Sequence, residues 1–585
     1  MGGFAGFENL PAAFIYNMKK IWEETKNILH NKCYLIALII TILCGYGFEI
    51  THPTIGIDDT DVNLYLDEGI QPQMGRWVMF SVNKIFRFSD FAPFMPELIG
   101  VILFSFSAVL FCVLFRRLLG AKFDIRACIV FSCLFISNPI IAFCYRYYYH
   151  NGMEIAYNCC ALALLYFYEG IHRPSLPGKE VGFSECAIRN YLISAVFVWI
   201  AAGCYEAFVI MFIVGVLVVL FLDDSDESRA FGRLCIRILM AALTVLMCIL
   251  MRAITIPLIT AVFGLSNGYL HLNERGFLEM FVLFNGHEGL LELKMLIKRF
   301  FVTYHLNALV YLPITVYEIS CFVFGIASII KAIKKKSLVH PLLFVGMIIA
   351  PFLLVILEAK LTFYRSTQYL PFFAAVGISY LYVCLMERLN NADCGENIKR
   401  HKQILVYITQ FICLILIFNQ SMELNKAFYM DYREYELSKE VLLNVAHDVE
   451  SEYGREKPLV FIGEFNLPYE YMKDFYVPYT SWQYRTIEKI TDVIDPHLKE
   501  KYWQPEGYCF INEGNLPMIR WALDAIDGTN MQMMRFLKLH GHNFSTIRDA
   551  DEYTRIRTEG EALKLPHYPE SGYIKNMGEY ILINL

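Results

Sequence analysis

Long apolar stretches separated by short polar segments fill the first 420 residues of the chain. Most approach the roughly 20 residues that an α-helix needs to cross the apolar core of a bilayer. Together they predict a polytopic α-helical membrane protein with about 11 transmembrane helices. The stretches lie at Cys33–Phe48, Pro96–Phe115, Arg126–Cys144, Met153–Tyr168, Asn190–Gly203, Ala207–Leu222, Cys235–Ile256, Asn307–Ile330, Pro341–Leu357, Gln368–Leu385 and Ile404–Asn419.

Different patterns flank this region. Residues 1–32 interleave apolar and lysine positions, which predicts an amphipathic interfacial helix on the cytoplasmic surface. Residues 421–585 are richer in charges, and short strand-like runs alternate there with helical ones, so we expect an extracytoplasmic α/β domain. Its predicted elements are the strands Leu459–Gly463 and Tyr580–Ile583 and the helices Glu436–Val449 and Asn530–Leu539. Residues 33–420 would form the transmembrane domain, with a first outer loop at 49–95.

Composition supports the membrane assignment. Of the 585 residues 56% are hydrophobic and 18% charged, whereas soluble proteins carry about 25% charged residues. The net charge of -6, without a basic stripe, argues against a nucleic-acid partner. Most of the 17 cysteines lie in apolar stretches, and their spacing predicts neither a disulfide framework nor a zinc site.

Basic residues are distributed unevenly between the two sides. Up to Asn419, roughly 22 of them fall on the side of the N-terminus and about 10 on the other side. This bias predicts a multi-pass protein of the cell membrane with a cytoplasmic N-terminus. An odd number of spans then puts the C-terminus, like the first loop, outside the cytoplasm.

Three carboxylates crowd the start of the first outer loop, at Asp58, Asp59 and Asp61. Ionisable groups near membrane depth are candidates for function, and a carboxylate here could take a proton from an incoming hydroxyl. The alternative is that they cap a helix starting at Val62, for which one Asp suffices. We therefore interpret Asp59 or Asp58 as a general base and Asp61 as the cap. The pair could also bind a divalent metal, but without a spaced third ligand we expect no metal or other cofactor.

Several cations and aromatic residues could bind an anionic substrate. Arg76, in the triplet Gly75-Arg76-Trp77, follows the acidic run, and Arg146 lies in the aromatic run Tyr145–Asn151. Arg252 and Arg365 occur near the outer ends of apolar stretches. Each of these arginines could hold a phosphate. Trp77, next to Arg76 in the sequence, could also contribute to substrate binding. The alternatives are an aromatic belt around Arg146 and snorkelling of the other arginines to lipid headgroups.

Tyr205 and Glu206 separate two short apolar stretches. The two stretches could form a helical hairpin, with these residues at its tip, or one broken helix. A carboxylate at such a tip must face a cavity or a partner, so both residues are candidates for substrate binding. A structural Glu paired with an Arg elsewhere is the alternative.

Other signals are missing from the sequence. We find no phosphate-binding glycine-rich loop and no nucleophile elbow, and the cytoplasmic loops are short. Any chemistry would therefore take place outside the cytoplasm, with an activated substrate linked to lipid. A transporter or flippase is the main alternative, although no internal repeat supports it. A non-catalytic surface scaffold is a third possibility.

The order of these motifs resembles a known family. The acidic pair, the Gly75-Arg76-Trp77 triplet, the Tyr205-Glu206 tip and the strand-rich tail are similar to the Gtr type II family of O-antigen and cell-surface glucosyltransferases, in the GT-C superfamily. The resemblance implies a GT-C-like fold, a polyprenyl-phosphate-linked sugar donor, with glucose as the expected sugar, and a cell-surface glycan acceptor. It also implies an acidic base, which falls on Asp58 or Asp59, and a cation at Arg76. In the family the tip commonly reads Tyr-Gln, so the role of Glu206 does not transfer directly.

Overall fold

Helices make up most of the described chain, as the sequence predicts. In this computed structural model the described residues are 10–55, 72, 75–86, 94–145, 152–172, 185–223, 231–264, 311–353, 366–391, 396–463, 465, 477–478, 485, 489, 508–509 and 529–585. Every one of the apolar stretches predicted above overlaps a helix. The helices up to residue 453 are α1 (Leu10–Leu29), α2 (Lys32–Thr51), α5 (Trp77–Phe86), α6 (Met95–Leu119), α7 (Ile125–Ile136), α8 (Ala142–Tyr145), α9 (Met153–His172), α10 (Glu185–Cys204), α11 (Phe208–Leu222), α12 (Phe231–Phe263), α15 (Tyr311–Lys335), α16 (Val339–Ile349), α18 (Tyr369–Asn391) and α19 (Glu396–Tyr453).

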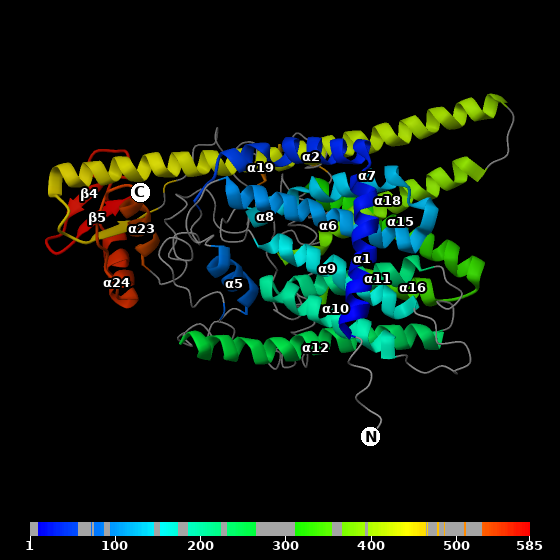
Figure 1. Ribbon diagram of the computed structural model, residues 1–585. Coiled ribbons are helices and arrows are strands. Elements are labelled where there is room, and N and C mark those ends of the chain that lie inside the picture. Colours follow the sequence, from blue (N-terminus) through cyan, green and yellow to red (C-terminus); the bar gives the residue numbers. More distant parts are fainter. Residues whose placement is uncertain are drawn as a thin grey trace, which may run out of the picture.

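Within the described ranges, eight helices are long and apolar enough to cross a membrane, and α11 and α16 are shorter apolar helices. Many of the long ones run alongside one another in Figure 1. α12 exposes large aliphatic side chains such as Leu246, Leu250 and Ile254, which is expected of a helix that faces lipid. The protein is thus a helical membrane protein, and the count of about 11 spans stays a prediction.

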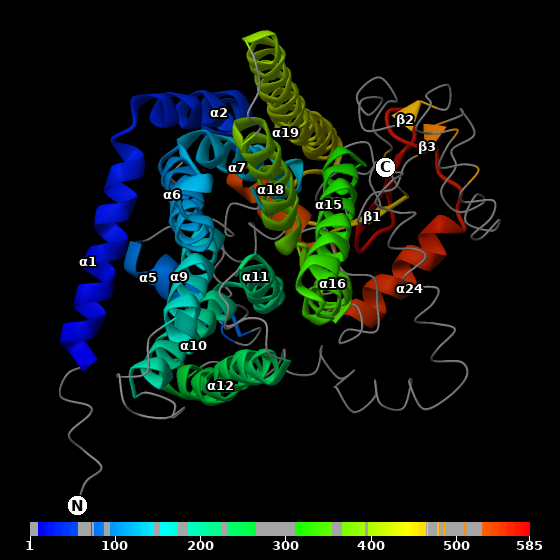
Figure 2. The same cartoon turned by 90° about the vertical axis from the view of Figure 1, so that its right-hand side faces the viewer.

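The centre of the bundle is α11. Figure 2, viewed along the bundle, shows α11 between α9 and α10 on one side and α16 on the other. Nearly all of its side chains are buried. Next to it, aromatic rings fill the space between α6, α7 and α18, with Phe111 and Phe372 4.8 Å apart between ring centroids. Such interlocked rings add to the stability that comes from burial alone.

The predicted stretch Arg126–Cys144 is not one uninterrupted helix. α7 ends at Ile136, and a 3₁₀ turn at Pro139–Ile141 precedes α8. Proline has no backbone N–H and cannot continue the α-helical hydrogen-bond pattern. The Asn138 side chain instead accepts a hydrogen bond from the backbone N–H of Ile140. The helix therefore breaks close to one end of the bundle.

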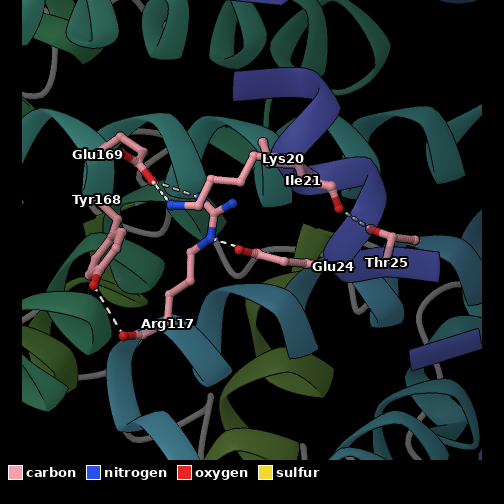
Figure 3. A network of polar contacts seen from close by, with 7 residues as sticks. All are labelled: Lys20, Ile21, Glu24, Thr25, Arg117, Tyr168 and Glu169. Atoms are coloured by element: carbon pink, nitrogen blue, oxygen red, sulfur yellow. Dashed lines mark hydrogen bonds and ion pairs between the residues drawn. The ribbon is translucent and has the colours of Figure 1, made fainter. Parts of the chain in front are cut away.

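α1 runs crosswise to the long helices on one flank of the bundle (Figures 1 and 2). It buries Ile21 and Ile28 and exposes Ile15 and Trp22, as expected for an interfacial helix. Ion pairs hold it in place, as Figure 3 shows. Arg117 Nε of α6 lies 2.7 Å from Glu24 Oε2, and Nη1 lies 2.8 Å from Glu169 Oε1 of α9. We call the end of the bundle near Arg117 and Glu169 the α1 end, and the opposite end the α5 end.

A small sheet lies beyond the α5 end (Figure 1). β1 (Leu459–Ile462) pairs in parallel with β5 (Ile581–Asn584), which pairs antiparallel with β4 (Ile574–Asn576). α23 (Met531–Leu539) and the last turns of α19 pack on one face of the sheet, and α24 (Ala550–Glu561) packs on the other. Both faces are covered, which explains why β1 and β5 are apolar without alternation. Two further strands, β2 (Val477–Pro478) and β3 (Tyr508–Cys509), pair separately.

We call β1, β4, β5, α23 and α24 the C-terminal sheet unit. β1, β5 and α23 agree with elements predicted from the sequence, whereas β4 and α24 were not predicted. The expected boundary at residue 420, however, lies inside α19, which continues for 58 residues without a break. The two parts of the chain therefore share a helix.

Candidate active site

Arg76 is buried at the α5 end, at the start of α5. Gly75 has φ +81°, a left-handed conformation that glycine adopts without steric strain. It directs the chain so that Arg76 immediately precedes the first helical residue, Trp77. Arg76 is 4% exposed. A buried guanidinium requires partners, because leaving its charge without them in an apolar setting is costly.

Two partners come from the break between α10 and α11. Arg76 Nη2 lies 3.5 Å from Glu206 Oε1, and the Arg76 guanidinium carbon lies 4.7 Å from the centre of the Tyr205 ring. The Tyr205 hydroxyl in turn shares a hydrogen bond of 2.7 Å with Ser366 Oγ, just ahead of α18. The break between α10 and α11 thus links Arg76, at the start of α5, to the residue just ahead of α18.

Arg252 of α12 joins the same cluster. Its Nη1 donates to the Ala202 carbonyl at 3.4 Å. Its guanidinium lies so close to Gly75 that a Cβ built there would come within 2.2 Å of Nη2. Glycine at position 75 is therefore needed twice, for its backbone conformation and for the space that Arg252 occupies.

Trp77 packs on α10. Its ring centroid lies 4.5 Å from that of Trp199. A Cβ added to Gly203 would come within 2.4 Å of Trp77 Nε1. The missing side chain at Gly203 is what allows the indole to lie against α10.

Five of the predicted site residues are thus gathered at the α5 end, from elements far apart in sequence: Arg76, Trp77, Tyr205, Glu206 and Arg252. Their roles stay predictions. The remaining ones, Asp58, Asp59, Arg146 and Arg365, lie outside the described residues, as does Asp61. No group of three or more His, Cys, Asp or Glu side chains that could hold a metal ion occurs among the residues that the structure describes. The prediction about metal at Asp58 and Asp59 is therefore still to be tested.

The charge of Glu206 follows from its surroundings. It lies in the break between α10 and α11, and 36% of its side chain is exposed. Burial raises the pKa of its carboxyl, but the Arg76 and Arg252 guanidinium groups outweigh this and lower the pKa below its ordinary value. Glu206 is therefore ionised at neutral pH and suits the role of a counter-ion better than that of a general base.

Sequence reasoning missed several polar residues near the cluster. Ser366 is one, and the neighbouring Gln368 bonds to the hydroxyl of Tyr157 through its side-chain oxygen. Glu154, near the start of α9, is also buried. Ser366-Thr367-Gln368 directly precedes an apolar stretch, and Glu154 is the second residue of another. Their position at the ends of apolar stretches was the signal that could have identified these polar residues.

A bundle of long apolar helices with two arginines, one of them buried, gathered at one end defines the class: a helical membrane protein with a polar cluster at one end of the bundle. Comparison with known families is more specific. Residues 47–386, more than half of the chain, match the family described as glucosyl transferase GtrII, so the chain belongs to this family. The match includes every residue of the cluster and ends within α18. The protein is a glycosyltransferase, as its resemblance to the Gtr type II family predicted. Comparisons with curated proteins and with solved structures gave no match.

Proposed function

We propose that the protein transfers glucose from a polyprenyl-phosphate donor to a cell-surface glycan on the outer face of the membrane. Family membership carries the glucosyl transfer and favours it over the transporter alternative. The observation that supports a lipid-phosphate donor is the pair of guanidinium groups near Glu206: Arg76 forms an ion pair with it, and Arg252 lies against Gly75, the residue before Arg76. Guanidinium groups match the geometry of phosphate oxygens.

The position of Arg252 supports entry of the donor from the bilayer. α12 exposes aliphatic side chains, among them Leu250 and Ile254, on either side of Arg252 in the sequence. Arg252 itself reaches Ala202 and Gly75 inside the bundle. A lipid-linked phosphate that arrives along α12 would thus meet a cation without leaving the apolar phase. Arg365, which precedes Ser366 in the sequence, and Arg146 would add to the phosphate site.

The proposed reaction is a single displacement at the anomeric carbon. A hydroxyl oxygen of the acceptor forms the new bond to this carbon, and its proton passes to the carboxylate of Asp59 or Asp58. The bond between the anomeric carbon and the phosphate oxygen breaks, and polyprenyl phosphate leaves with the electron pair. Attack from the opposite face inverts the configuration. Fixed cations that stabilise the departing phosphate would lower the barrier, and no metal or general acid is required.

The same proposal assigns the two sides of the membrane. α1 pairs with Arg117 and Glu169 near the C-terminal ends of α6 and α9, and the C-terminal sheet unit lies beyond the opposite end of the bundle (Figure 1). The excess of basic residues on the α1 side favours a cytoplasmic N-terminus. The α5 end, the arginine cluster and the C-terminal sheet unit would then be extracytoplasmic, where the sheet unit could meet the glycan acceptor.

The test is transfer in proteoliposomes that contain polyprenyl-phosphate-glucose and a purified cell-surface glycan. We expect labelled glucose to appear in the glycan, and Asp59→Asn or Asp58→Asn to abolish this. Wild-type transfer by both variants would exclude the assigned base. Reversible loss of activity on chelation would show that a metal is required, and absence of transfer from the lipid donor by wild-type protein would refute the donor.

A further inference from the structure

A buried tyrosine connects the arginine cluster to the start of α18. Tyr205, Ser366 and Arg76 are each less than one-tenth exposed. One face of the Tyr205 ring lies 4.7 Å from the Arg76 guanidinium carbon, and its hydroxyl lies 2.7 Å from Ser366 Oγ. The phenol is thus held at both ends, by a cation at the ring and a hydroxyl at the tip.

This arrangement differs from an ordinary core tyrosine. Tyr34 and Ser132 also share a buried hydrogen bond, of 2.8 Å, between α2 and α7, but no cation contact with Tyr34 is found among the described residues. At Tyr205 the hydrogen bond fixes the plane of the ring, and the ring attracts the guanidinium strongly once water is excluded. The pair Tyr205–Ser366 therefore controls where the Arg76 charge lies.

The contact with Glu206 differs from the contact with Tyr205. The Glu206 carboxylate lies 3.5 Å from Arg76, and 36% of its side chain is exposed, so this ion pair constrains the guanidinium less tightly than a short buried one would. A bidentate contact with a phosphate demands a fixed fork of N–H groups. The tyrosine ring supplies a second, directional constraint that the carboxylate does not.

We propose that Tyr205 and Ser366 are positioning residues that hold the Arg76 guanidinium in the orientation needed to bind the phosphate of the donor. This rests on the proposed function, because it specifies how the same site binds an anionic lipid. Tyr205 acts on the substrate through Arg76, and Ser366 acts through Tyr205. Neither is required to touch the reacting atoms.

The test compares two tyrosine–serine pairs in full-length protein in nanodiscs, with binding of polyprenyl monophosphate as the first measurement. Tyr205→Phe keeps the ring and removes the hydroxyl, and Ser366→Ala removes its partner. We expect each to raise the Kd by about threefold to tenfold, the range for one hydrogen bond. The double variant should bind no worse than either single variant, because both changes break the same bond. Ser366→Thr, which keeps a hydroxyl, should restore binding.

Tyr34→Phe and Ser132→Ala are the matched controls and should leave the Kd unchanged. In transfer assays the first two variants should raise the KM for the donor and leave the KM for the acceptor unchanged. Equal Kd values for Tyr205→Phe and Tyr34→Phe, or independent effects in the double variant, would overturn the inference. Wild-type protein that neither binds polyprenyl monophosphate nor uses the lipid donor would instead refute the proposed function, so the two failures are distinct.

Discussion

Two buried arginines at opposite ends of the bundle have very different surroundings. At the α1 end, Arg117 is 9% exposed in its side chain and lies within 2.8 Å of two carboxylates, Glu24 and Glu169. At the α5 end, the side chain of Arg76 is 5% exposed, its contact with Glu206 is 3.5 Å, and the Tyr205 ring is a further partner. Two short, charge-assisted bonds fix an arginine in one orientation. A longer ion pair and a ring suit the phosphate-binding role that we propose for Arg76.

The comparison predicts the largest effect for Arg117→Ala, and the effect should be on stability. Breaking a fully buried ion pair costs about 3–5 kcal/mol; because Glu169 and Glu24, left without Arg117, are 16% and 33% exposed, we expect a loss at the lower end of this range. Thermal unfolding in detergent should show a clearly lowered Tm, while transfer by the folded fraction stays near wild type. A variant with normal Tm and no transfer would reverse the roles assigned to the two ends.

Arg76→Ala should lower the transfer activity and leave the Tm nearly unchanged. Loss of one fixed group that stabilises developing charge lowers kcat by about 100-fold or more. Arg76→Lys should not restore it, because an ammonium lacks the planar fork of N–H groups. Measured transfer close to wild type with a lowered Tm would make Arg76 a structural residue like Arg117.

Gly75→Ala tests the close approach of Arg252. The new Cβ would collide with the guanidinium, and we expect transfer to fall by about tenfold, equivalent to about 1.4 kcal/mol. Gly264→Ala is the matched control, since Gly264 also has a left-handed backbone, with φ +64°, but no atom of the described residues lies within 4 Å of its would-be Cβ. Equal loss of transfer in the two variants would mean that backbone strain alone is responsible.

A smaller effect is expected for Glu206→Gln. The amide keeps the volume and an acceptor oxygen, and Tyr205 still contacts Arg76, so transfer should change by about threefold or less, the value of one hydrogen bond. Because the arginines lower the pKa of Glu206, its carboxyl is ionised above the ordinary carboxyl pKa and loses its charge only as the pH falls through the lowered value. The pH–rate profile between about pH 5 and 8 should therefore keep its shape in Glu206→Gln. Loss of a limb of that profile would identify Glu206 as the base in place of Asp59 or Asp58.

The smallest effect should come from Lys20→Ala in the Arg117 network. Lys20 Nζ lies 3.7 Å from Glu169, and half of the lysine side chain is exposed. Exposed pairs contribute about 0.2–1 kcal/mol, so the Tm should hardly change. A loss as large as that of Arg117→Ala would show that the network acts as one unit.

The apolar helices could be predicted because a stretch of about 20 apolar residues has few stable alternatives. The continuity of α19 could not, since composition changes near residue 420 although the backbone does not. That segment contains neither Pro nor Gly, and this absence of helix breakers was the clue. The break at Pro139 had a visible cause in the sequence but lies inside an otherwise apolar stretch.

The site was partly predictable for a similar reason. An ionisable residue in an apolar stretch must find a partner or a cavity, which singled out Arg76, Glu206 and Arg252. Which carboxylate meets which arginine depends on the packing of three helices, and sequence spacing holds no information about it. The position of Ser366 beside an apolar stretch was only a weak signal, because a lone serine is common and chemically neutral. Its importance comes from Tyr205, 161 residues away.

The uninterrupted α19 places a geometric constraint on the molecule. At 1.5 Å per residue its 58 residues extend about 87 Å, nearly three times the apolar thickness of a bilayer. Leu442 and Val449, near its end, are buried against the sheet. Each inserted residue would raise the sheet by about 1.5 Å and swing it by about 100° around the helix axis. After about 18 inserted residues, or five full turns, the sheet would face its original direction again. The length of α19 therefore sets the direction in which the sheet faces relative to the bundle.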